Sequence, residues 1–342
     1  MSTNFNAVPS FSVISGDQIH SAIFSNVEGV LSVVRDAYLA HHHGETVNPD
    51  SYFLRFPLRP RDRIIALPAH IEPRHGTAMT GIKWISSFPN NIERGIPRAS
   101  AVIVLNDPQT GYPRVCLEGG TISAARTAAS AVLAARALNR NERAGAIGIV
   151  GCGLIGRYII EFFLATGWSV SSLYVNDRVS AYARKFADRF DDVFPDGAHV
   201  EETPEDVVGR SDIAIFATTA SAPYVRSPDA FKHSPLVLHI SLRDLAPQLI
   251  LAAHNVVDDI DHCLKANTST HLAEQLVGNR DFVEFTLPAI LAGGAAPVRS
   301  KPIIFSPFGM GILDIAVAHS LFEQVAAAGR LVEVSNFFFD AQ

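Results

Sequence analysis

Three glycines in one short segment indicate a phosphate-binding turn. The pattern Gly151-x-Gly153-x-x-Gly156 follows a buried strand predicted over 146–150 and precedes an apolar helix predicted over 157–166. Gly151 allows a tight bend, Gly153 lets backbone amides approach a pyrophosphate, and Gly156 lets the helix pack closely on the strand. The unpaired N–H groups at the start of such a helix favour negative charge. The segment therefore predicts a dinucleotide-binding turn.

A second predicted strand supports this prediction, because the run 171–175 ends at Asn176 and Asp177. An acidic residue about 20 positions after the last glycine is where a ribose 2′-hydroxyl would be held. Arg178 follows and could instead meet the 2′-phosphate of NADP. We favour NAD because Asp177 would repel that phosphate. NADP stays open as an alternative if Asn176 occupies the ribose position.

Cationic side chains occur inside apolar segments of the first part of the chain. Arg126 lies in the alanine-rich run 123–135, where a buried charge needs a partner. It either binds a substrate carboxylate or pairs with a structural carboxylate such as Glu118. Lys83 lies in a predicted strand, where a solvent-facing lysine is the ordinary outcome and a functional one is the alternative. Arg55 has the same two interpretations.

A carboxylate follows another predicted strand. Asp244 comes after the apolar run 236–240, at the end from which a parallel strand presents residues to a cofactor. It could accept a proton from a substrate amine as a general base, or it could cap a helix that follows Pro247. Thr218 and Thr219 close the preceding predicted strand. They would line the nucleotide, or else they are ordinary strand-end residues.

The elements around these residues fall into two groups. From residue 146 onward, short and continuously apolar strands alternate with helices, which is typical of a parallel sheet covered on both faces. We expect a doubly wound α/β Rossmann-type domain over 129–314. Residues 1–128 and 315–342 are expected to form an α+β domain. Its predicted elements are a helix over 17–41 broken near Gly29, strands over 52–56, 64–68, 79–86, 99–105 and 113–118, a helix over 121–138 that leads to the Rossmann domain, and a helix over 309–329 that returns from it.

Composition excludes several functional classes. The chain has 342 residues, of which 48% are hydrophobic, and a formal net charge of −6, and it has no run of basic residues. A nucleic-acid or anionic-membrane surface is therefore not expected. Three separated cysteines without CxxC spacing argue against disulfides and structural zinc. The triplet His41-His42-His43 lacks the further ligands of a metal site. No signal segment or membrane-spanning run is recognisable, so a cytoplasmic protein is expected.

Several segments of the sequence together resemble those of a known protein family. The sequence resembles the ornithine cyclodeaminase/mu-crystallin family over nearly its whole length. Further segments resemble a branch of NAD-dependent dehydrogenases that make 2,3-diaminopropionate for siderophores and peptide antibiotics. The family segments are Gly81-Ile-Lys-Trp84, Thr110-Gly-Tyr-Pro113, 121–130, Gly151–Gly156 and Phe308-Gly-Met-Gly311, and the branch segments are 51–55, 83–89, 239–245, 257–262 and 267–269.

The resemblance implies both a site and a reaction. It implies a homodimeric enzyme in which the domain of residues 1–128 and 315–342 binds substrate and forms the dimer contact. The substrate would be a small amino-acid-like polycarboxylate, a glutamate whose nitrogen carries a diaminopropionate-derived arm. Oxidation by NAD to an imine, followed by hydrolysis, would release 2-oxoglutarate and L-2,3-diaminopropionate. Ornithine cyclodeaminase, another amino-acid dehydrogenase or imine reductase, and a non-catalytic carrier are the alternatives. The implied residues are Asp244 and Lys83 for catalysis, Tyr52, Arg55, Lys83 and Arg126 for substrate, and Gly151, Gly153, Leu154, Ile155, Gly156, Asn176, Asp177, Thr218, Thr219, Ser241 and Gly309 for cofactor.

Overall fold

The structure is a computed structural model that describes residues 9–74, 76–139 and 141–338. The chain divides into two compact units. The first consists of 1–126 and 310–342, and the second of 127–309. These divisions lie two residues and five residues before the domain boundaries expected from the sequence. The chain passes from one unit to the other inside a single helix, α3 (Gly119–Asn139), and again between Gly309 and Met310.

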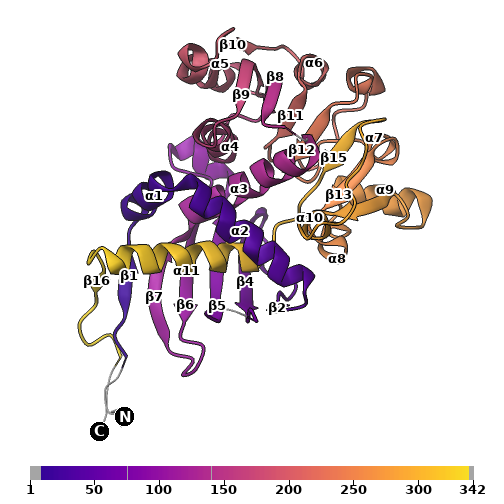
Figure 1. The fold of residues 1–342 in the computed structure, drawn as a ribbon. Helices are drawn as coiled ribbons and strands as arrows, with labels where there is room; N and C mark the ends of the chain where they lie inside the picture. The colour runs from indigo at the N-terminus through magenta and orange to yellow at the C-terminus, as the bar shows by residue number, and fades with distance from the viewer. Residues whose placement is uncertain (1–8, 75, 140, 339–342) are drawn as a thin grey trace. The chain divides into compact units, whose positions relative to one another are not determined.

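The first unit is built on a mostly antiparallel sheet (Figure 1). Its strand order is β16-β1-β7-β6-β5-β4-β2, and β3 pairs with β4. Only the β1–β7 pair is parallel among the pairs described for this sheet. The strands are β1 (Ser12–Ile14), β2 (Thr46–Val47), β3 (Tyr52–Phe56), β4 (Arg59–Ile71), β5 (Met79–Ser87), β6 (Ala99–Asn106), β7 (Pro113–Glu118) and β16 (Val332–Glu333).

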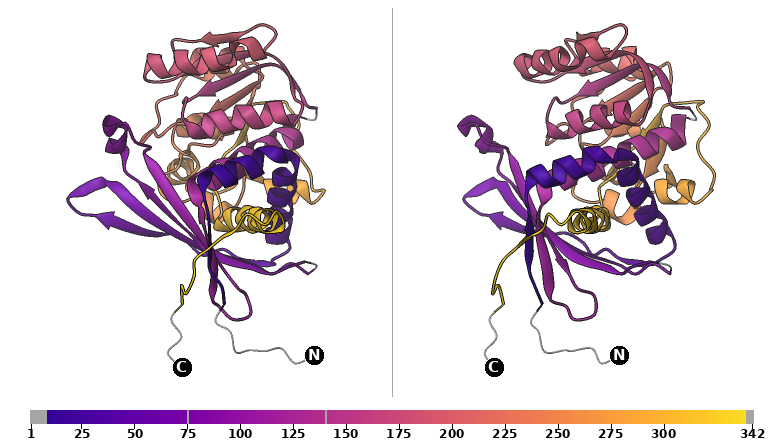
Figure 2. Two further views of the ribbon diagram at one scale, coloured as in Figure 1. Left: turned by 90° about the vertical axis from the view of Figure 1, so that its left-hand side faces the viewer. Right: turned by 60° about the vertical axis from the view of Figure 1, so that its left-hand side comes forward.

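Helices cover one face of this sheet. Figure 2 shows α1 (Gly16–Ser25), α2 (Val27–His42) and α11 (Gly311–Ala327) on the same side of the strands. The interface is tight, since a Cβ added at Gly81 would come within 3.0 Å of Ile315 on α11. The predicted helix break near Gly29 occurs instead at Asn26, whose side chain accepts the Gly29 N–H and so begins a new helix.

The second unit contains an eight-stranded sheet in which every described pair is parallel. The order across the sheet is β10-β9-β8-β11-β12-β15-β13-β14. Successive strands are added in one direction from β8 to β10 and in the other direction from β11 to β14, so the topological switch point lies between β8 and β11. The α/β fold with a doubly wound parallel sheet, predicted from the sequence, is confirmed. The strands are β8 (Arg143–Val150), β9 (Ser169–Asn176), β10 (Ala198–Val200), β11 (Ile213–Phe216), β12 (Leu236–His239), β13 (His254–Val257), β14 (Val283–Thr286) and β15 (Ile303–Phe305).

The central strands of this sheet are apolar on both faces. β11 and β12 are buried at every position, and Phe216, Val237 and Ile304 belong to a continuous hydrophobic core. Burial on both faces explains why these strands read as unbroken apolar runs. Sequence reasoning missed β14 and β15, which are only four and three residues long. The helices of this unit are α4 (Leu154–Ala165), α5 (Ser180–Phe190), α6 (Pro204–Arg210), α7 (Pro247–Leu251), α8 (Ile260–Cys263), α9 (Ser269–Val277) and α10 (Leu287–Leu291), and its 3-10 turns are η2 (Asp191–Val193) and η3 (Pro228–Phe231). A further 3-10 turn, η1 (Pro89–Arg94), belongs to the first unit.

Candidate active site

The glycine-rich turn joins β8 to α4 at the reversal point of the parallel sheet. Gly151 has a φ of 100°, and a Cβ there would lie 2.6 Å from the Ala217 carbonyl oxygen. A Cβ at Gly156 would lie 2.5 Å from the Gly151 carbonyl oxygen, whereas nothing lies within 4 Å of a Cβ at Gly153. Gly153 is the N-cap of α4 and offers no capping side chain. The first N–H groups of this helix, which begins with Leu154, therefore face an open cradle suited to a pyrophosphate.

Two neighbouring residues at the end of β9 have different roles. The Asp177 carboxylate accepts hydrogen bonds from the backbone N–H groups of Cys152 and Val179, both at 2.9 Å. It therefore reaches the glycine-rich turn, where a ribose would be bound. The Asn176 side chain is buried and donates to the carbonyl oxygens of Glu201 and Glu202. Its amide is used in holding the fold, so Asp177 is the better candidate for the ribose.

A hydrogen-bonded cluster surrounds Asp244, which is fully buried. Its carboxylate accepts hydrogen bonds from the hydroxyls of Thr218, Tyr224 (2.9 Å) and Ser241 (2.5 Å). The His239 Nε2 atom lies 3.2 Å from the same carboxylate and 3.2 Å from the Asp244 backbone nitrogen. Helix α7 has Ala246 as its N-cap, without a side-chain cap. Asp244 is therefore not the helix cap that the sequence left open as its alternative role.

The groups around Asp244 determine how this buried carboxylate titrates. Burial alone would raise the pKa of Asp244, but the hydrogen bond and charge of His239 and the hydrogen bonds from Ser241 and Thr218 outweigh burial, and the pKa lies below its ordinary value. Burial and the charge of Asp244 raise the pKa of Tyr224. Asp244 is thus held as a carboxylate and Tyr224 as a phenol. The other predicted residue of this region, Thr219, is exposed.

A second buried cluster, in the first unit, joins two predicted cations through one carboxylate. Lys83 Nζ lies 2.6 Å from one Asp314 oxygen, and Arg126 Nε lies 3.2 Å from the other. The Ser123 hydroxyl is 3.3 Å from Lys83 Nζ. Lys83 is 2% exposed and Asp314 is fully buried. The expectation of a solvent-facing lysine is therefore wrong, because β5 presents Lys83 to the face that α11 covers.

The partner of Arg126 also differs from the structural partner considered in the sequence. Glu118 instead accepts the backbone N–H groups of Gly120 (2.6 Å) and Thr121 (2.9 Å) and so satisfies the start of α3. Asp314 takes the pairing role. Two cations and one carboxylate give this cluster a net charge of +1 when all three are ionised. A buried excess of positive charge with arginine and lysine donors suits a substrate carboxylate.

The lysine of this cluster titrates near neutral pH. Burial lowers the pKa of Lys83 to about 8, the charge of Asp314 opposes that shift, and the charge of Arg126 adds to it. Removing a lysine from water disfavours its charged form, whereas a carboxylate beside it favours that form. Lys83 therefore has the protonation equilibrium of a group able to take up or release a proton during a reaction at neutral pH.

The remaining two predicted substrate residues lie elsewhere on the same sheet. In the backbone register, Arg55 on β3 lies directly opposite Arg63 on β4, and Arg63 lies directly opposite Ser87 on β5. Because side chains alternate along a strand, Ser87 and Arg55 share the sheet face of Lys83. Tyr52 is 70% exposed and lies on the opposite face. The structure therefore places Arg55 on the face of Lys83 and does not bring Tyr52 to it.

Sequence reasoning missed Asp314, Tyr224, His239 and Asp258 as site residues. Asp314 had a signal, since it is an acidic residue within the apolar helix α11. Asp258 follows β13 and is 1% exposed. Its carboxylate accepts the N–H groups of Phe308 (2.9 Å) and Gly309 (2.7 Å). Gly309 is thereby held at a φ of 88°, in the segment assigned to the cofactor.

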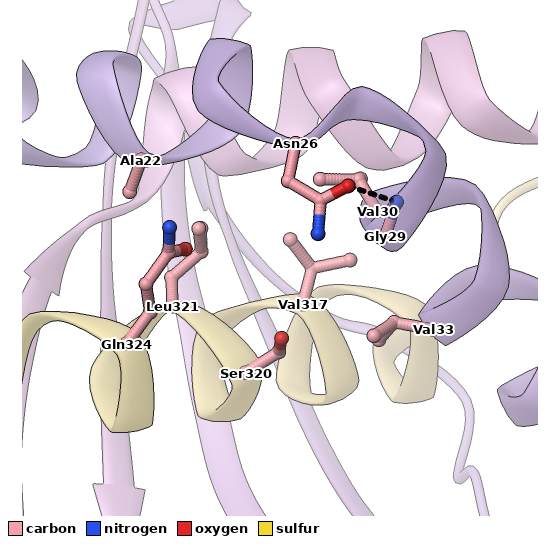
Figure 3. A pocket seen from close by; sticks show the side chains of 9 residues that line it. All are labelled: Ala22, Asn26, Gly29, Val30, Val33, Val317, Ser320, Leu321 and Gln324. Carbon is pink, nitrogen blue, oxygen red and sulfur yellow. Dashed lines mark hydrogen bonds between the residues drawn. The ribbon is translucent and has the colours of Figure 1, made fainter. Parts of the chain in front are cut away.

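A small pocket between helices of the first unit is a separate feature (Figure 3). Its polar side chains are used in the fold, since Asn26 caps α2 and Gln324 donates to Ser25 at 3.0 Å. Among residues 9–74, 76–139 and 141–338, no group of His, Cys, Asp or Glu could hold a metal ion. His41 of the histidine triplet contacts Thr46. No helix in the described ranges is both long and apolar enough for a membrane crossing.

Comparison with known proteins gives the family. Residues 17–329 match the model of the ornithine cyclodeaminase/mu-crystallin family. The chain belongs to this family. One similar relative is N-((2S)-2-amino-2-carboxyethyl)-L-glutamate dehydrogenase of Staphylococcus aureus, 33% identical over 306 residues, which are 86% of this chain and 89% of that protein.

Solved structures of the family share the fold. Thermococcus litoralis Delta(1)-pyrroline-2-carboxylate reductase, in complex with NADH and L-proline, superposes with a TM-score of 0.85 at 23% identity. That match covers 95% of this chain and 99% of the other. An archaeal alanine dehydrogenase dimer with bound NAD gives a TM-score of 0.84 at 22% identity, covering 96% and 100%. The ornithine cyclodeaminase/mu-crystallin fold thus accounts for both units.

Proposed function

We propose that this protein oxidises N-(2-amino-2-carboxyethyl)-L-glutamate with NAD and water, giving 2-oxoglutarate, L-2,3-diaminopropionate, NADH and a proton. It is an NAD-dependent oxidoreductase of the ornithine cyclodeaminase/mu-crystallin family that acts on an amino-acid or imine substrate. The observation that carries the finer proposal is the buried cluster of Lys83, Arg126 and Asp314, with its net positive charge. Support also comes from the similarity to the dehydrogenase of Staphylococcus aureus.

The residues of the second unit fit the cofactor. The open cradle at Gly153, the uncapped start of α4 and the Asp177 carboxylate are suited to a pyrophosphate and a ribose. Thr218, Ser241 and Gly309 follow strands of the same sheet and are assigned to the cofactor as well. When bound, NAD supplies the acceptor for the hydride that leaves the glutamate α-carbon.

The cations of the first unit hold the substrate. Lys83 and Arg126 bind the carboxylate next to the carbon that is oxidised, and Asp314 fixes both cations in place. Lys83, whose pKa is about 8, also exchanges a proton with the substrate nitrogen. The resulting C=N bond is hydrolysed, and the carbinolamine collapses to the ketone and the amine. Fixed positive charge near the site lowers the cost of holding a polyanionic substrate.

Asp244 is the proposed proton acceptor of the second unit. Its oxygens are covered by hydroxyl groups, so a proton from the secondary amine reaches it through Thr218, Ser241 or Tyr224. Its lowered pKa keeps it ionised at neutral pH and also makes it a weak base, so the proton passes on from Asp244 to water rather than staying on it. The same carboxylate then helps orient the water that adds to the C=N bond. The groups around Asp244 stabilise its negative charge, and we assign to that charge the roles of accepting the proton and orienting the water.

Product analysis tests the proposed reaction. Incubation with NAD and N-(2-amino-2-carboxyethyl)-L-glutamate is expected to give NADH and 2-oxoglutarate in equal amounts. Ammonia and proline from ornithine without net NADH would instead show a cyclodeaminase. NADH consumption with a cyclic imine alone would show a reductase. Binding of NAD and ligand without turnover of any of these would show a carrier, and each of these three results would refute the proposal.

Cofactor preference tests the ribose assignment. Asp177→Ser removes the negative charge that repels a 2′-phosphate and leaves Arg178 beside it. We expect the preference for NAD over NADP, measured as the ratio of kcat/KM values, to fall by about tenfold or more. Asn176→Ser is the neighbouring control, since the Asn176 amide bonds only backbone carbonyls in the described contacts. A larger change in preference from Asn176→Ser would contradict the assignment.

We also propose a homodimer formed through the outer face of the first sheet. That face is opposite α11 and exposes Val13, Leu54, Trp84 and Val102, whose exposed fractions are 38% to 48%. Large apolar side chains gathered on one sheet face favour association. Trp84→Glu is expected to give monomers in light scattering, whereas Leu276→Glu, at an exposed leucine on α9 of the second unit, is the control. A monomeric wild-type protein would contradict the proposal.

A further inference from the structure

Three arginines lie together at one end of the first sheet. Arg55 on β3 lies directly opposite Arg63 on β4, and Arg63 lies directly opposite Ser87 on β5. Arg98, which precedes β6, donates from Nη1 to the Ser87 hydroxyl at 2.6 Å. The register therefore places Arg55 and Arg63 in one row with Ser87, and the Arg98 guanidinium contacts Ser87 directly. The Arg55 guanidinium lies 4.9 Å from the centre of the Phe53 ring. We call these three residues the arginine cluster.

The arginine cluster lacks acidic partners. Among the residues that the structure describes, no Asp or Glu forms an ion pair with Arg55, Arg63 or Arg98. The neighbouring Asp62 pairs with Arg59 instead, at 3.7 Å. Arg63 Nε is buried and has no hydrogen-bond partner within that part of the chain. A buried guanidinium donor without an acceptor is costly, so the cluster is suited to an anion.

Electrostatic interactions within the cluster agree with this geometry. Burial and then the charge of Arg55 lower the pKa of Arg63. Burial and then the charge of Arg63 lower the pKa of Arg98. Each cation therefore disfavours the charge of its neighbour. A bound carboxylate would relieve that repulsion and offer oxygens to two guanidinium groups at once.

The register of the sheet relates the arginine cluster to Lys83. Lys83 and Ser87 lie on the same face of β5, four residues apart, which corresponds to about 13 Å along a strand. Between them on this face lie Ile85 and its cross-strand neighbour Ile65. The face therefore carries cations at both ends and an apolar floor between. A ligand with separated carboxylates and a hydrocarbon link between them would match this pattern.

We propose that Arg63 and Arg98, with Arg55, bind a carboxylate of the substrate remote from the reacting carbon and thereby select polycarboxylates over simple amino acids. This inference rests on the proposed function, in which Lys83 and Arg126 hold the carboxylate next to that carbon. Arg63 and Arg98 determine specificity without a part in proton transfer. A monocarboxylate amino acid would occupy only the Lys83 end and gain nothing from the arginine cluster.

Binding to the NADH complex tests the arginine cluster independently of turnover. Titration calorimetry would compare 2-oxoglutarate, which carries two carboxylates, with pyruvate, which carries one. We expect wild type to bind 2-oxoglutarate about tenfold or more tightly than pyruvate. Arg63→Gln and Arg98→Gln should each weaken 2-oxoglutarate binding by about tenfold and leave pyruvate binding unchanged. Arg35→Gln is the matched control, because Arg35 is half exposed on α2 and paired with Asp36.

The outcomes separate the two proposals. Equal binding of the two ligands by wild type, or equal loss of both in the arginine variants, would overturn the role of the arginine cluster. Unchanged 2-oxoglutarate binding in Arg63→Gln and Arg98→Gln would also overturn it. Failure of wild type to oxidise N-(2-amino-2-carboxyethyl)-L-glutamate would refute the proposed reaction alone, since the difference between the two ligands remains measurable. In steady-state assays with N-(2-amino-2-carboxyethyl)-L-glutamate, Arg63→Gln and Arg98→Gln should each raise KM by about tenfold with little change in kcat.

Discussion

Asp314 and Asp244 are both fully buried carboxylates, but their surroundings differ in kind. Asp314 lies between two cations, Lys83 and Arg126. Asp244 is surrounded by hydroxyl groups and one imidazole. Equal burial therefore produces different chemistry. In the first unit the group that titrates near neutral pH is a lysine, and in the second unit a carboxylate is held ionised by hydrogen bonds from His239 and hydroxyl groups and by the charge of His239.

The difference shows that the partners of a buried charge decide its role more than burial does. Ion pairing lets the Asp314 cluster keep one excess positive charge, which a substrate anion can neutralise. Hydrogen bonds from hydroxyl groups and from His239 keep Asp244 negatively charged, and this charge can receive a proton. The two clusters thus suit opposite tasks, binding an anion and accepting a proton. The predictions below separate these tasks.

The largest effect is expected from Asp244→Asn. An amide cannot accept the proton, so turnover should fall by about 10² to 10⁴-fold. The NAD dissociation constant, measured by fluorescence titration, should stay nearly unchanged. Asp229→Asn is a control at an exposed carboxylate that pairs with Lys232. Near-normal turnover of Asp244→Asn would leave Lys83 as the acid and base of the reaction.

Asp314→Asn should destabilise the fold most. It leaves Lys83 and Arg126 buried without their carboxylate, which typically costs about 3 to 5 kcal/mol. Urea denaturation would measure the free energy of unfolding. Asp36→Asn, which removes the exposed partner of Arg35, should change it by less than about 1 kcal/mol. A small loss in Asp314→Asn would mean that Asp314 serves the site without holding the fold.

The pH dependence of stability should reveal Lys83. Its pKa is about 8 in the folded protein and the ordinary value is 10.5. Between these values the unfolded chain binds more protons, so the contribution of Lys83 to stability rises with pH, by up to about 1.4 kcal/mol per pH unit. The contribution is lost as the pH falls through 8. The free energy of unfolding would be measured against pH for wild type and for Lys83→Met, and the difference between the two curves isolates this rise. Parallel curves would contradict the shifted pKa of Lys83.

Tyr224→Phe should have the smallest effect of the four. It removes one donor to the Asp244 carboxylate and keeps the ring, so the free energy of unfolding should fall by about 1 to 3 kcal/mol. Loss of a donor also raises the pKa of Asp244, so the acid limb of the rate profile should move to higher pH. Tyr182→Phe is a control at an exposed tyrosine. An unmoved acid limb would show that the other donors suffice.

The fold of the second unit could be predicted because its signals are local. The glycine spacing after β8 and the continuous apolar runs of β11 and β12 depend on neighbouring residues only. The strand β15 escaped because three apolar residues do not distinguish a strand from a loop, and β14 escaped because Glu284 and Thr286 interrupt its apolar pattern. The burial of β15 comes from neighbours far along the chain, as in its pairing with β12.

The buried clusters could be predicted only in part. Asp314 is 231 positions from Lys83 and 188 from Arg126, and no spacing rule connects residues so far apart. The sequence therefore offered Glu118 as a partner for Arg126, although Glu118 satisfies the start of α3. Asp244 was found because it follows a predicted strand. Ser241 and His239 are only three and five residues from Asp244. Thr218 and Tyr224 are 26 and 20 residues away and reach it only in the folded sheet.

The buried Cys263 thiol can report how often the segment around it opens. This thiol is fully enclosed and has a pKa raised by burial and by the charge of Asp258. The sulfur atom lies 3.0 Å from an Asp258 oxygen and 3.1 Å from the Ser306 carbonyl oxygen, and its single S–H donates to one of them at a time. Alkylating reagents attack the thiolate, so this sulfur reacts only while the segment leading to Gly309 is detached. The rate of its labelling, followed by mass spectrometry, therefore counts the spontaneous openings of that segment.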